Sequence, residues 1–176
     1  MQAPKKAAPP AVKPAPAAAA VSSEEKIIAA IEKAGGSVRK LAQNDDRLEV
    51  SFYLAGAAIK DEHVALAKGL KKVVQVHLAR TGITNAAIAH LAGFTDLEQL
   101  HLENTAVGDP ALAALKGFSK LEYLNVYNTQ VTDAGLAHLT GLTNLKSLYV
   151  WQTKVTDDGI KKLKEALPKL NVIKGW

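Results

Sequence analysis

Residues 121–144 read LEYLNVYNTQVTDAGLAHLTGLTN, and this stretch is one copy of a 24-residue unit that recurs along most of the chain. Apolar residues alternate with polar ones around Leu124 and Val126, which is the period-two pattern of a β-strand. Leu136 and Leu139 in the second half have helical spacing. A strand followed by a short helix, repeated with a period below 30 residues, predicts a solenoid whose parallel strands stack into one sheet.

Five units align without a gap when they begin at Glu49, Val73, Leu97, Leu121 and Leu145. We number the positions of each unit from these residues. Positions four and six are apolar throughout and are expected to face the core: Phe52 and Leu54, Val76 and Leu78, Leu100 and Leu102, Leu124 and Val126, Leu148 and Val150. The first unit is the least regular, as expected beside a cap. The last unit carries one extra residue in ALPKL, and its helix is expected to end at Pro168 before a final half-turn.

Two polar columns recur with the same period. Position nine is Thr81, Thr105, Thr129 and Thr153, and we expect each hydroxyl to bond loop backbone after its strand. Position thirteen is Asp61, Asp109, Asp133 and Asp157, and the Asp109-Pro110 pair resembles an N-cap followed by the first helical residue. An aspartate that recurs wherever a helix must start indicates capping rather than catalysis.

These units carry a resemblance to a known family. Residues 49–172 resemble leucine-rich repeats, nearest to the cysteine-containing subtype, whose repeat is similar to LxxLxLxxCxxITDxGLxxL. The chain has LEYLNVYNTQVTDAGLAHL and LKSLYVWQTKVTDDGIKKL, with threonine in place of cysteine, and resembles bacterial repeats of the TDxGL type. The resemblance implies an α/β fold, a solenoid with a parallel β-sheet on its concave face and short helices on its convex face, and a role in protein binding. The strand-crossover rule predicts that it is right-handed.

The resemblance also bears on attached domains. Bacterial arrays of this kind can follow other domains, including cytochrome-c-like ones, through Ala/Pro linkers, but the chain has no CxxCH and so carries no such haem domain itself. Eukaryotic relatives are often substrate receptors behind an F-box, for which residues 22–48 are too short.

Residues 1–21, MQAPKKAAPPAVKPAPAAAAV, hold five prolines and little to bury, which predicts an extended, disordered tether. A signal peptide is the competing interpretation, but the prolines interrupt any apolar core for it. The compartment is therefore open: cytoplasmic if Met1 is the native start, exported if a signal or a preceding domain was removed.

Each end of the array has a candidate cap. In residues 22–48, Ser22 and Glu25 form a capping-box pattern, Gly35-Gly36 stops the helix, a strand covers residues 37–41, and Asn44-Asp45-Asp46 suggests a turn. This segment is expected to cover the amino-terminal end of the core. Residues 49–176 then form five repeats with a carboxy-terminal cap. Trp176 either folds over that end or is an exposed terminal side chain.

Composition excludes several classes of function. The chain has no cysteine, so disulfides, zinc–thiolate sites and cysteine nucleophiles are absent. The net charge is +5, and three of the lysines lie in residues 1–21, so the remainder is too evenly charged for a nucleic-acid partner. The longest apolar runs are too short for a membrane span. There is no phosphate loop, GxSxG or HExxH, so we expect no enzyme and no cofactor.

The candidate site comes from positions three, five and seven, which point to the concave face. Four of the nine aromatic residues of the chain gather there at the carboxy-terminal end: Tyr123, Tyr127, Tyr149 and Trp151. Tyr and Trp are preferred anchors of protein interfaces. We expect these four, with Asn125, His101 and Glu103, to bind a protein or peptide partner. The alternative is a stacked ladder that only stabilises the sheet.

Two further interpretations stay open. His77, His101 and Glu103 lie on neighbouring strands and could form a zinc site, although polar residues on a concave face need no metal. The chain could also be a structural accessory or spacer in a larger complex, a redox complex among them, held by its convex helices or its edges.

Overall fold

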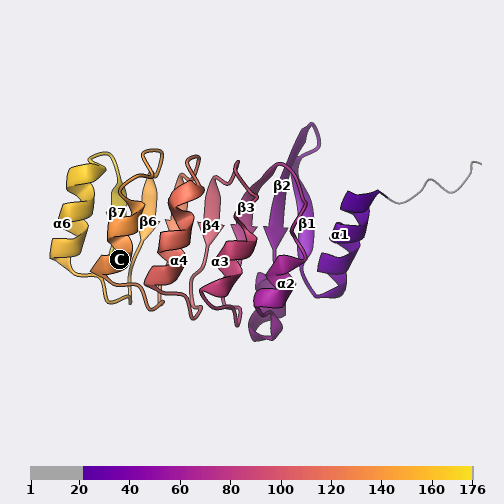
Figure 1. Ribbon diagram of the computed structural model, residues 1–176, viewed down its shortest axis with the longest axis horizontal. Helices are drawn as coiled ribbons and strands as arrows, with labels where there is room; N and C mark the ends of the chain where they lie inside the picture. The colour runs from indigo at the N-terminus through magenta and orange to yellow at the C-terminus, as the bar shows by residue number, and fades with distance from the viewer. Residues whose placement is uncertain (1–21, 176) are drawn as a thin grey trace, which may run out of the picture.

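The computed structural model describes residues 22–175, so the predicted tether of residues 1–21 and the predicted role of Trp176 lie outside the described residues. Within them one sheet of seven strands follows the order of the sequence from β1 to β7 (Figure 1). The strands are β1 (Ser37–Ala42), β2 (Asp45–Ser51), β3 (Val73–His77), β4 (Gln99–His101), β5 (Tyr123–Asn125), β6 (Ser147–Tyr149) and β7 (Asn171–Ile173). β1 is antiparallel to β2, and every later pair is parallel.

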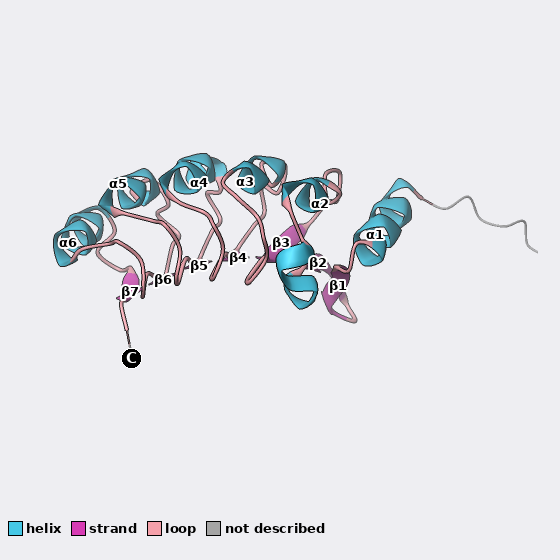
Figure 2. Cartoon of the chain, turned by 90° about the horizontal axis from the view of Figure 1, so that it is seen from below, coloured by secondary structure: helices cyan, strands magenta, loops and turns pink. Residues whose placement is uncertain are grey.

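Helices line the opposite layer. They are α1 (Ser23–Lys33), α2 (Asp61–Ala65), α3 (Ala86–His90), α4 (Asp109–Ala114), α5 (Asp133–Leu136) and α6 (Asp157–Ala166), with 3-10 helices η1 (Tyr53–Ala58), η2 (Leu115–Gly117) and η3 (Ala137–Leu139). Figure 2 shows α2 to α6 on the outer side of a curved array and the strands on the inner side. The predicted α/β leucine-rich repeat solenoid, with its sheet on the concave face, is confirmed.

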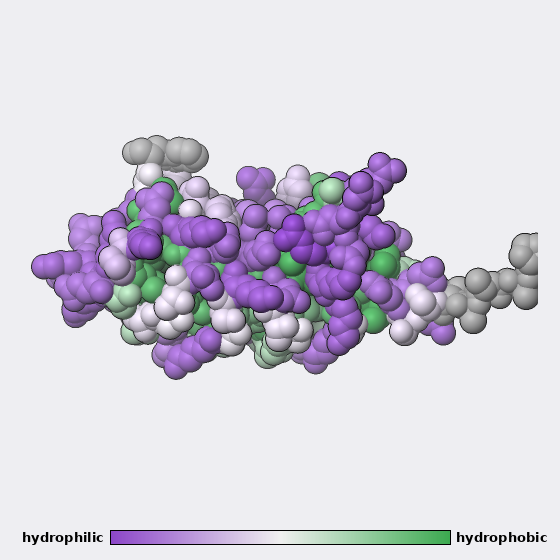
Figure 3. Space-filling model, turned by 90° about the horizontal axis from the view of Figure 1, so that it is seen from above, coloured by the Kyte–Doolittle hydropathy of each residue, from purple (hydrophilic) through white to green (hydrophobic). Residues whose placement is uncertain are grey.

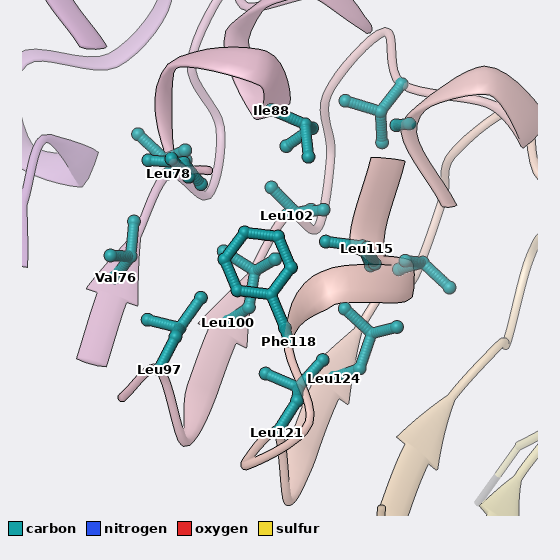
Figure 4. Packing of buried hydrophobic residues seen from close by; sticks show 14 of the residues in the cluster. Val76, Leu78, Ile88, Leu97, Leu100, Leu102, Leu115, Phe118, Leu121 and Leu124 are labelled. Carbon is teal, nitrogen blue, oxygen red and sulfur yellow. The ribbon is translucent and has the colours of Figure 1, made fainter. Parts of the chain in front are cut away.

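The core lies between these two layers. In the central units, the leucines at positions one, four and six point from the strand toward the helix, where Leu115 and Phe118 meet them (Figure 4). Leu97, Leu100 and Leu102 are fully buried. Each such side chain contributes roughly 1.5–3 kcal/mol of burial free energy before chain entropy is subtracted. The edge of the molecule seen from above in Figure 3 is mostly hydrophilic, with hydrophobic side chains showing in small separate areas.

The amino-terminal segment matches its sequence signals with one exception. The capping box is confirmed, since Ser22 Oγ accepts from the Glu25 amide and the Glu25 carboxylate accepts from the Ser22 amide. The turn predicted at Asn44-Asp45-Asp46 begins one residue earlier and ends two residues earlier, because Asp45 and Asp46 already belong to β2 and the turn falls on residues 43–44. The assignment of residues 22–48 as a cap stays a prediction.

The gapless alignment of the first unit is wrong. β2 pairs with β3 at an offset of 26 residues, so Val50 lies beside Val76 and Ser51 beside His77. Leu54, predicted at a core position, is 75% exposed. The two additional residues are taken up by η1, where Gly56 has a φ of 57°. Phe52, directly after β2, takes the core position that was predicted for Leu54: it is buried, and its amide donates to the His77 carbonyl.

The last unit also differs from expectation. The segment predicted as a half-turn is a strand, β7, parallel to β6. Leu148 pairs with Val172, so the 24-residue spacing holds in the strand and the extra residue of ALPKL does not displace it. α6 ends at Ala166, ahead of Pro168 as predicted.

The aspartate column does not cap its own helices. The carboxylates of Asp61, Asp109 and Asp133 instead reach a threonine of the next unit: Asp109 accepts from the amide and hydroxyl of Thr132 at 2.8 and 2.7 Å, and Asp133 accepts from Thr156 at 2.8 and 2.6 Å. The side chains that do cap are Thr132 and Thr156. The predicted capping role was therefore wrong, because each of these aspartates bonds to a threonine 23 residues later, in the next unit.

A glycine in each following unit makes room for this contact. A methyl group at Gly135 would meet the Asp109 carboxylate, and one at Gly159 would meet the Asp133 carboxylate. The repeated glycines Gly93, Gly117 and Gly141 differ from these, because a Cβ atom there would meet nothing within 4 Å. The TDxGL motif is thus one inter-unit joint made of Thr, Asp and Gly.

Candidate functional site

The concave face presents three rows of side chains. Strand register places position three as Glu49, Gln75, Gln99, Tyr123, Ser147 and Asn171, and position five as Ser51, His77, His101, Asn125, Tyr149 and Ile173. Position seven follows directly as Ala79, Glu103, Tyr127 and Trp151. Those last three are held side by side because the amides of Arg80, Asn104 and Asn128 bond to the carbonyls of Glu103, Tyr127 and Trp151 at 2.9 Å. The first unit enters these rows two residues earlier than its sequence alignment predicts.

The four predicted aromatic residues come together at the carboxy-terminal end, and we call them the aromatic surface: Tyr123, Tyr127, Tyr149 and Trp151. Tyr127 and Trp151 stack with ring centroids 5.2 Å apart and planes 15° from parallel. Tyr123 and Tyr149 lie 5.3 Å apart at 43°. All four side chains are half-buried.

A hollow of about 250 Å³ lies within this surface. It is lined by Asn125, Tyr127, Tyr149, Trp151, Ile173 and Gly175. Asn125, predicted at the site, has a second role there, since its Oδ1 accepts from the Tyr127 amide at 3.0 Å and so fixes the backbone that carries that ring. Ring walls with polar groups at the rim are typical of a surface that receives an extended chain.

The rings also form a ladder along the face. His77 stacks on His101 at 4.0 Å and 13°, and His101 lies 4.7 Å from Tyr123 at 33°. With the contact between Tyr123 and Tyr149, four neighbouring strands are connected through their rings. Cross-strand stacking, the alternative interpretation, is therefore present, and the last ring of the ladder, Tyr149, also borders the hollow.

Burial shifts the pKa of two of these rings away from the usual value. Burial, reinforced by the facing imidazole of His101, holds the pKa of His77 below its usual value, against the opposing effects of Glu49 and Glu103. Burial also raises the pKa of Tyr123, with smaller contributions from Tyr149 and Glu103. Both effects favour the neutral form, so these rings present uncharged faces at neutral pH.

Glu103 stands where the ladder meets the aromatic surface. Its Oε1 lies 3.6 Å from His101 Nδ1, beyond a good hydrogen bond. Its Oε2 is buried and has no hydrogen-bond partner among residues 22–175. Burying an unpaired carboxylate oxygen is costly, which makes Glu103 a receptive group on this face.

The geometry does not favour zinc at His77, His101 and Glu103. Imidazole nitrogens direct their lone pairs in the ring plane, and two rings stacked at 13° point those lone pairs alongside each other instead of toward a shared ion. No group of three His, Cys, Asp or Glu side chains among the described residues is arranged to hold a metal ion. None of the helices of residues 22–175 combines the length and apolar character needed to cross a bilayer.

Position eight shapes the concave face in a way that the sequence pattern did not predict. Arg80, Asn104, Asn128 and Gln152 all have φ between 50° and 58°, the left-handed region, and so turn the chain sharply after each concave side chain. Asn128 Nδ2 donates to Asn104 Oδ1 at 2.9 Å, which connects two of these turns. The signal was the asparagine at position eight in two consecutive units, because Asn tolerates this conformation better than most residues.

Comparisons with known proteins bear on the fold. No family model and no curated protein matches the sequence. Among solved structures, a leucine-rich repeat protein of Leptospira interrogans aligns with a TM-score of 0.50 and 21% identity over 61% of this chain and 27% of that one. Two internalins of Listeria monocytogenes are also similar. One (inlF) has a TM-score of 0.44 and 20% identity over 65% of this chain and 37% of that one, and internalin C2 has 0.48 and 18% over 86% and 83%.

The chain therefore spans about a quarter of the length of the Leptospira protein. At these identities the likeness concerns the fold alone. Together with the seven-stranded sheet, the 24-residue strand offset and the helices on the outer side, it identifies the architecture: the chain folds as a leucine-rich repeat solenoid.

Proposed function

We propose that the chain is a non-catalytic recognition module whose aromatic surface binds a protein or peptide. The observation that carries this proposal is the hollow of about 250 Å³ bordered by the stacked Tyr127 and Trp151. Large aromatic side chains that are already fixed by packing lose little entropy on binding and supply most of the energy at protein interfaces. Asn125, His101 and Glu103 would add polar contacts around these anchors.

The test is site-specific photo-crosslinking in the native host. A photoreactive phenylalanine analogue replaces Tyr149 in one variant and His138, on the convex side, in a matched control. We expect the Tyr149 variant to crosslink one identifiable partner, and we expect that crosslink to disappear when Tyr127→Ala and Trp151→Ala are added. The same product from both positions, or a product that survives the two substitutions in a folded protein, would remove the proposal.

A structural accessory role is the second candidate, supported by a convex hollow of about 330 Å³ between α5 and α6. It is lined by Asp133, Ala134, Leu136, Ala137, Thr140, Gly159, Lys162 and Leu163. This hollow would seat a side chain of a neighbouring subunit, in a redox complex or another assembly. Crosslinks from His138 with none from Tyr149 would favour this role over concave recognition.

A further inference from the structure

The aromatic surface has one charged group beside it. From β4 to β7, the side chains at positions three, five and seven include a single formal charge, the Glu103 carboxylate, when the histidines are neutral. Its Oε2 is buried without a hydrogen-bond partner in the described part of the chain. A cationic donor brought to this oxygen would compensate its lost hydration. The chemistry of the face therefore selects a ligand with one positive charge.

The rest of the ligand is set by the rings. Trp151 lies two strands beyond Glu103, and the strand spacing puts about 10 Å between them. Exposed ring faces in a groove are what proline-rich, extended segments bind. Such a segment advances about 3.1 Å per residue. A segment that fits would carry its prolines three or four residues away from its cation.

Residues 1–21 of this chain, which lie outside the described residues, have this composition. They contain five prolines, three lysines and no acidic residue. Lys13 stands three and four residues after Pro10 and Pro9. We propose that residues 9–13 bind the aromatic surface of their own chain, with Lys13 Nζ at the Glu103 carboxylate, whose side chain is 20% exposed, and the two prolines against Tyr127 and Trp151.

Direction and length agree with this placement. Ser22 begins the described chain at the β1 end, and α1 follows it there (Figure 1). Lys13 lies nine residues before Ser22, about 28 Å when extended, and the path from Ser22 to β4 comprises at most the length of α1, about 16 Å, and the spacing from β1 to β4, about 14 Å. Followed backwards from Ser22, the segment reaches Lys13 first and Pro10 and Pro9 afterwards. Followed from the β1 end, the concave face presents Glu103 first and Trp151 afterwards. A segment that enters from the β1 end therefore brings its lysine to Glu103 and its prolines to the rings.

This inference rests on the proposed function, because it assigns an occupant to the same surface. The occupant would compete with any partner, so binding by a partner would require the segment to leave. The segment is tethered, and its effective concentration at the surface is in the millimolar range for a short linker. A weak contact is then sufficient to cover the aromatic surface for much of the time.

The absence of cysteine provides a direct test in the full chain. Ala11→Cys introduces the one thiol, which is modified with a nitroxide spin label, and amide NMR signals are recorded on the ¹⁵N-labelled protein. We expect stronger paramagnetic broadening at Asn104, Asn128 and Gln152, which directly follow the three position-seven residues, than at Lys162 on the convex α6. Mixing spin-labelled ¹⁴N protein with unmodified ¹⁵N protein tests for contacts between molecules.

Substitutions in the labelled protein make the test specific. Lys13→Gln or Glu103→Gln should lower the broadening at Asn104 about two- to fivefold, the effect of one exposed charge pair. The exchanged pair Lys13→Glu with Glu103→Lys should restore it. Glu165→Gln, which removes the same charge from α6, should change nothing.

Three results would overturn the inference. They are equal broadening on both faces, broadening indifferent to Lys13 and Glu103, and broadening that occurs only between molecules in the mixed sample. Each leaves the crosslinking test of the proposed function intact, since a partner can bind an unoccupied surface. Conversely, a segment that binds while Tyr149 captures no partner would remove the proposed function alone.

Discussion

The concave face and the turns that follow the strands are built from the same units. Only the turns, which we call the turn side, repeat the same side-chain contacts from unit to unit. On the turn side, Thr105 and Thr129 each donate a hydroxyl to the backbone carbonyl three residues earlier, at 2.6 Å. On the concave face, position seven changes from Ala79 through Glu103 to aromatic rings. A side chain that fixes the turn of every unit must find the same partner each time, whereas a side chain that faces outward can change freely. The non-repeating side is therefore where this protein can be specific.

The largest expected difference in unfolding free energy is between substitutions at two neighbouring residues of β5. Leu124 is fully buried and Tyr123 is half-buried on the concave face. Leu124→Ala should lower the free energy of unfolding by about 2–5 kcal/mol, because it leaves a cavity between the layers. Tyr123→Ala should cost about 1 kcal/mol, the value of lost ring contacts. Guanidinium unfolding measures both, and equal losses would contradict the division between the two faces.

The second comparison uses two glycines of one unit. Gly135→Ala forces a methyl group onto the Asp109 carboxylate and should cost about 1–3 kcal/mol, as overpacking does. Gly141→Ala meets nothing within 4 Å and should be neutral or stabilise by up to about 1 kcal/mol. Thermal melting followed by circular dichroism distinguishes them. If Gly141→Ala were the more damaging, the joint assigned to TDxGL would be in the wrong place.

The aspartate column provides a smaller effect. Asp133→Ala removes the acceptor of two Thr156 hydrogen bonds and should cost on the order of 1 kcal/mol. Asp157, at the end of the column and 89% exposed, pairs only with Lys174 in the described residues, and its replacement by Ala should cost less. Hydrogen bonding to Thr156 lowers the pKa of Asp133, so its contribution is present above pH 3.8 and is lost as the pH falls through the lowered value. Chemical denaturation at about pH 7 compares the two variants, and equal losses would contradict the larger cost expected for Asp133→Ala. Repeating it at about pH 2.5 tests the pH dependence, since the cost of Asp133→Ala should then be smaller than at about pH 7.

The smallest effect concerns pH and His77. Because burial and His101 hold its folded pKa below the usual 6.5, the unfolded chain binds the proton more readily. Stability from this group is full above pH 6.5 and falls as the pH drops toward the lowered value, while Glu49 and Glu103 nearby limit the loss. His77→Gln should flatten the stability curve between about pH 7 and pH 5. An unchanged slope would show that His77 does not report the environment described for it.

Much of this architecture could be predicted because it is periodic. The core positions from Val76 onward, the threonine hydroxyls and the gathering of Tyr127, Tyr149 and Trp151 all follow from a fixed repeat and the alternation of strand side chains.

The first unit could not be aligned in this way. Val50, Phe52 and Leu54 are all apolar at period two, and a shift of two residues keeps every side chain on its face, so alternation cannot choose between the registers. The insertion in η1 decides it.

The contacts that escaped prediction are those between units. Asp109 and Asp133 stand where capping residues stand, and only the neighbouring unit shows that their carboxylates leave their own helix. The stacking of His77 on His101, which disfavours a shared metal ion, likewise depends on ring orientations that spacing does not contain. Binding by the aromatic surface stays a proposal.

The joint between units also determines how such a chain can change in length. The unit of residues 121–144 offers an aspartate, Asp133, to the unit after it, and a threonine with a glycine, Thr132 and Gly135, to the unit before it. A copy of residues 121–144 inserted after Asn144 would bring all three groups, so both new junctions would be complete without any other substitution. Duplication can thus lengthen the solenoid one unit at a time, and each added unit arrives with three outward positions that are free to acquire a new specificity.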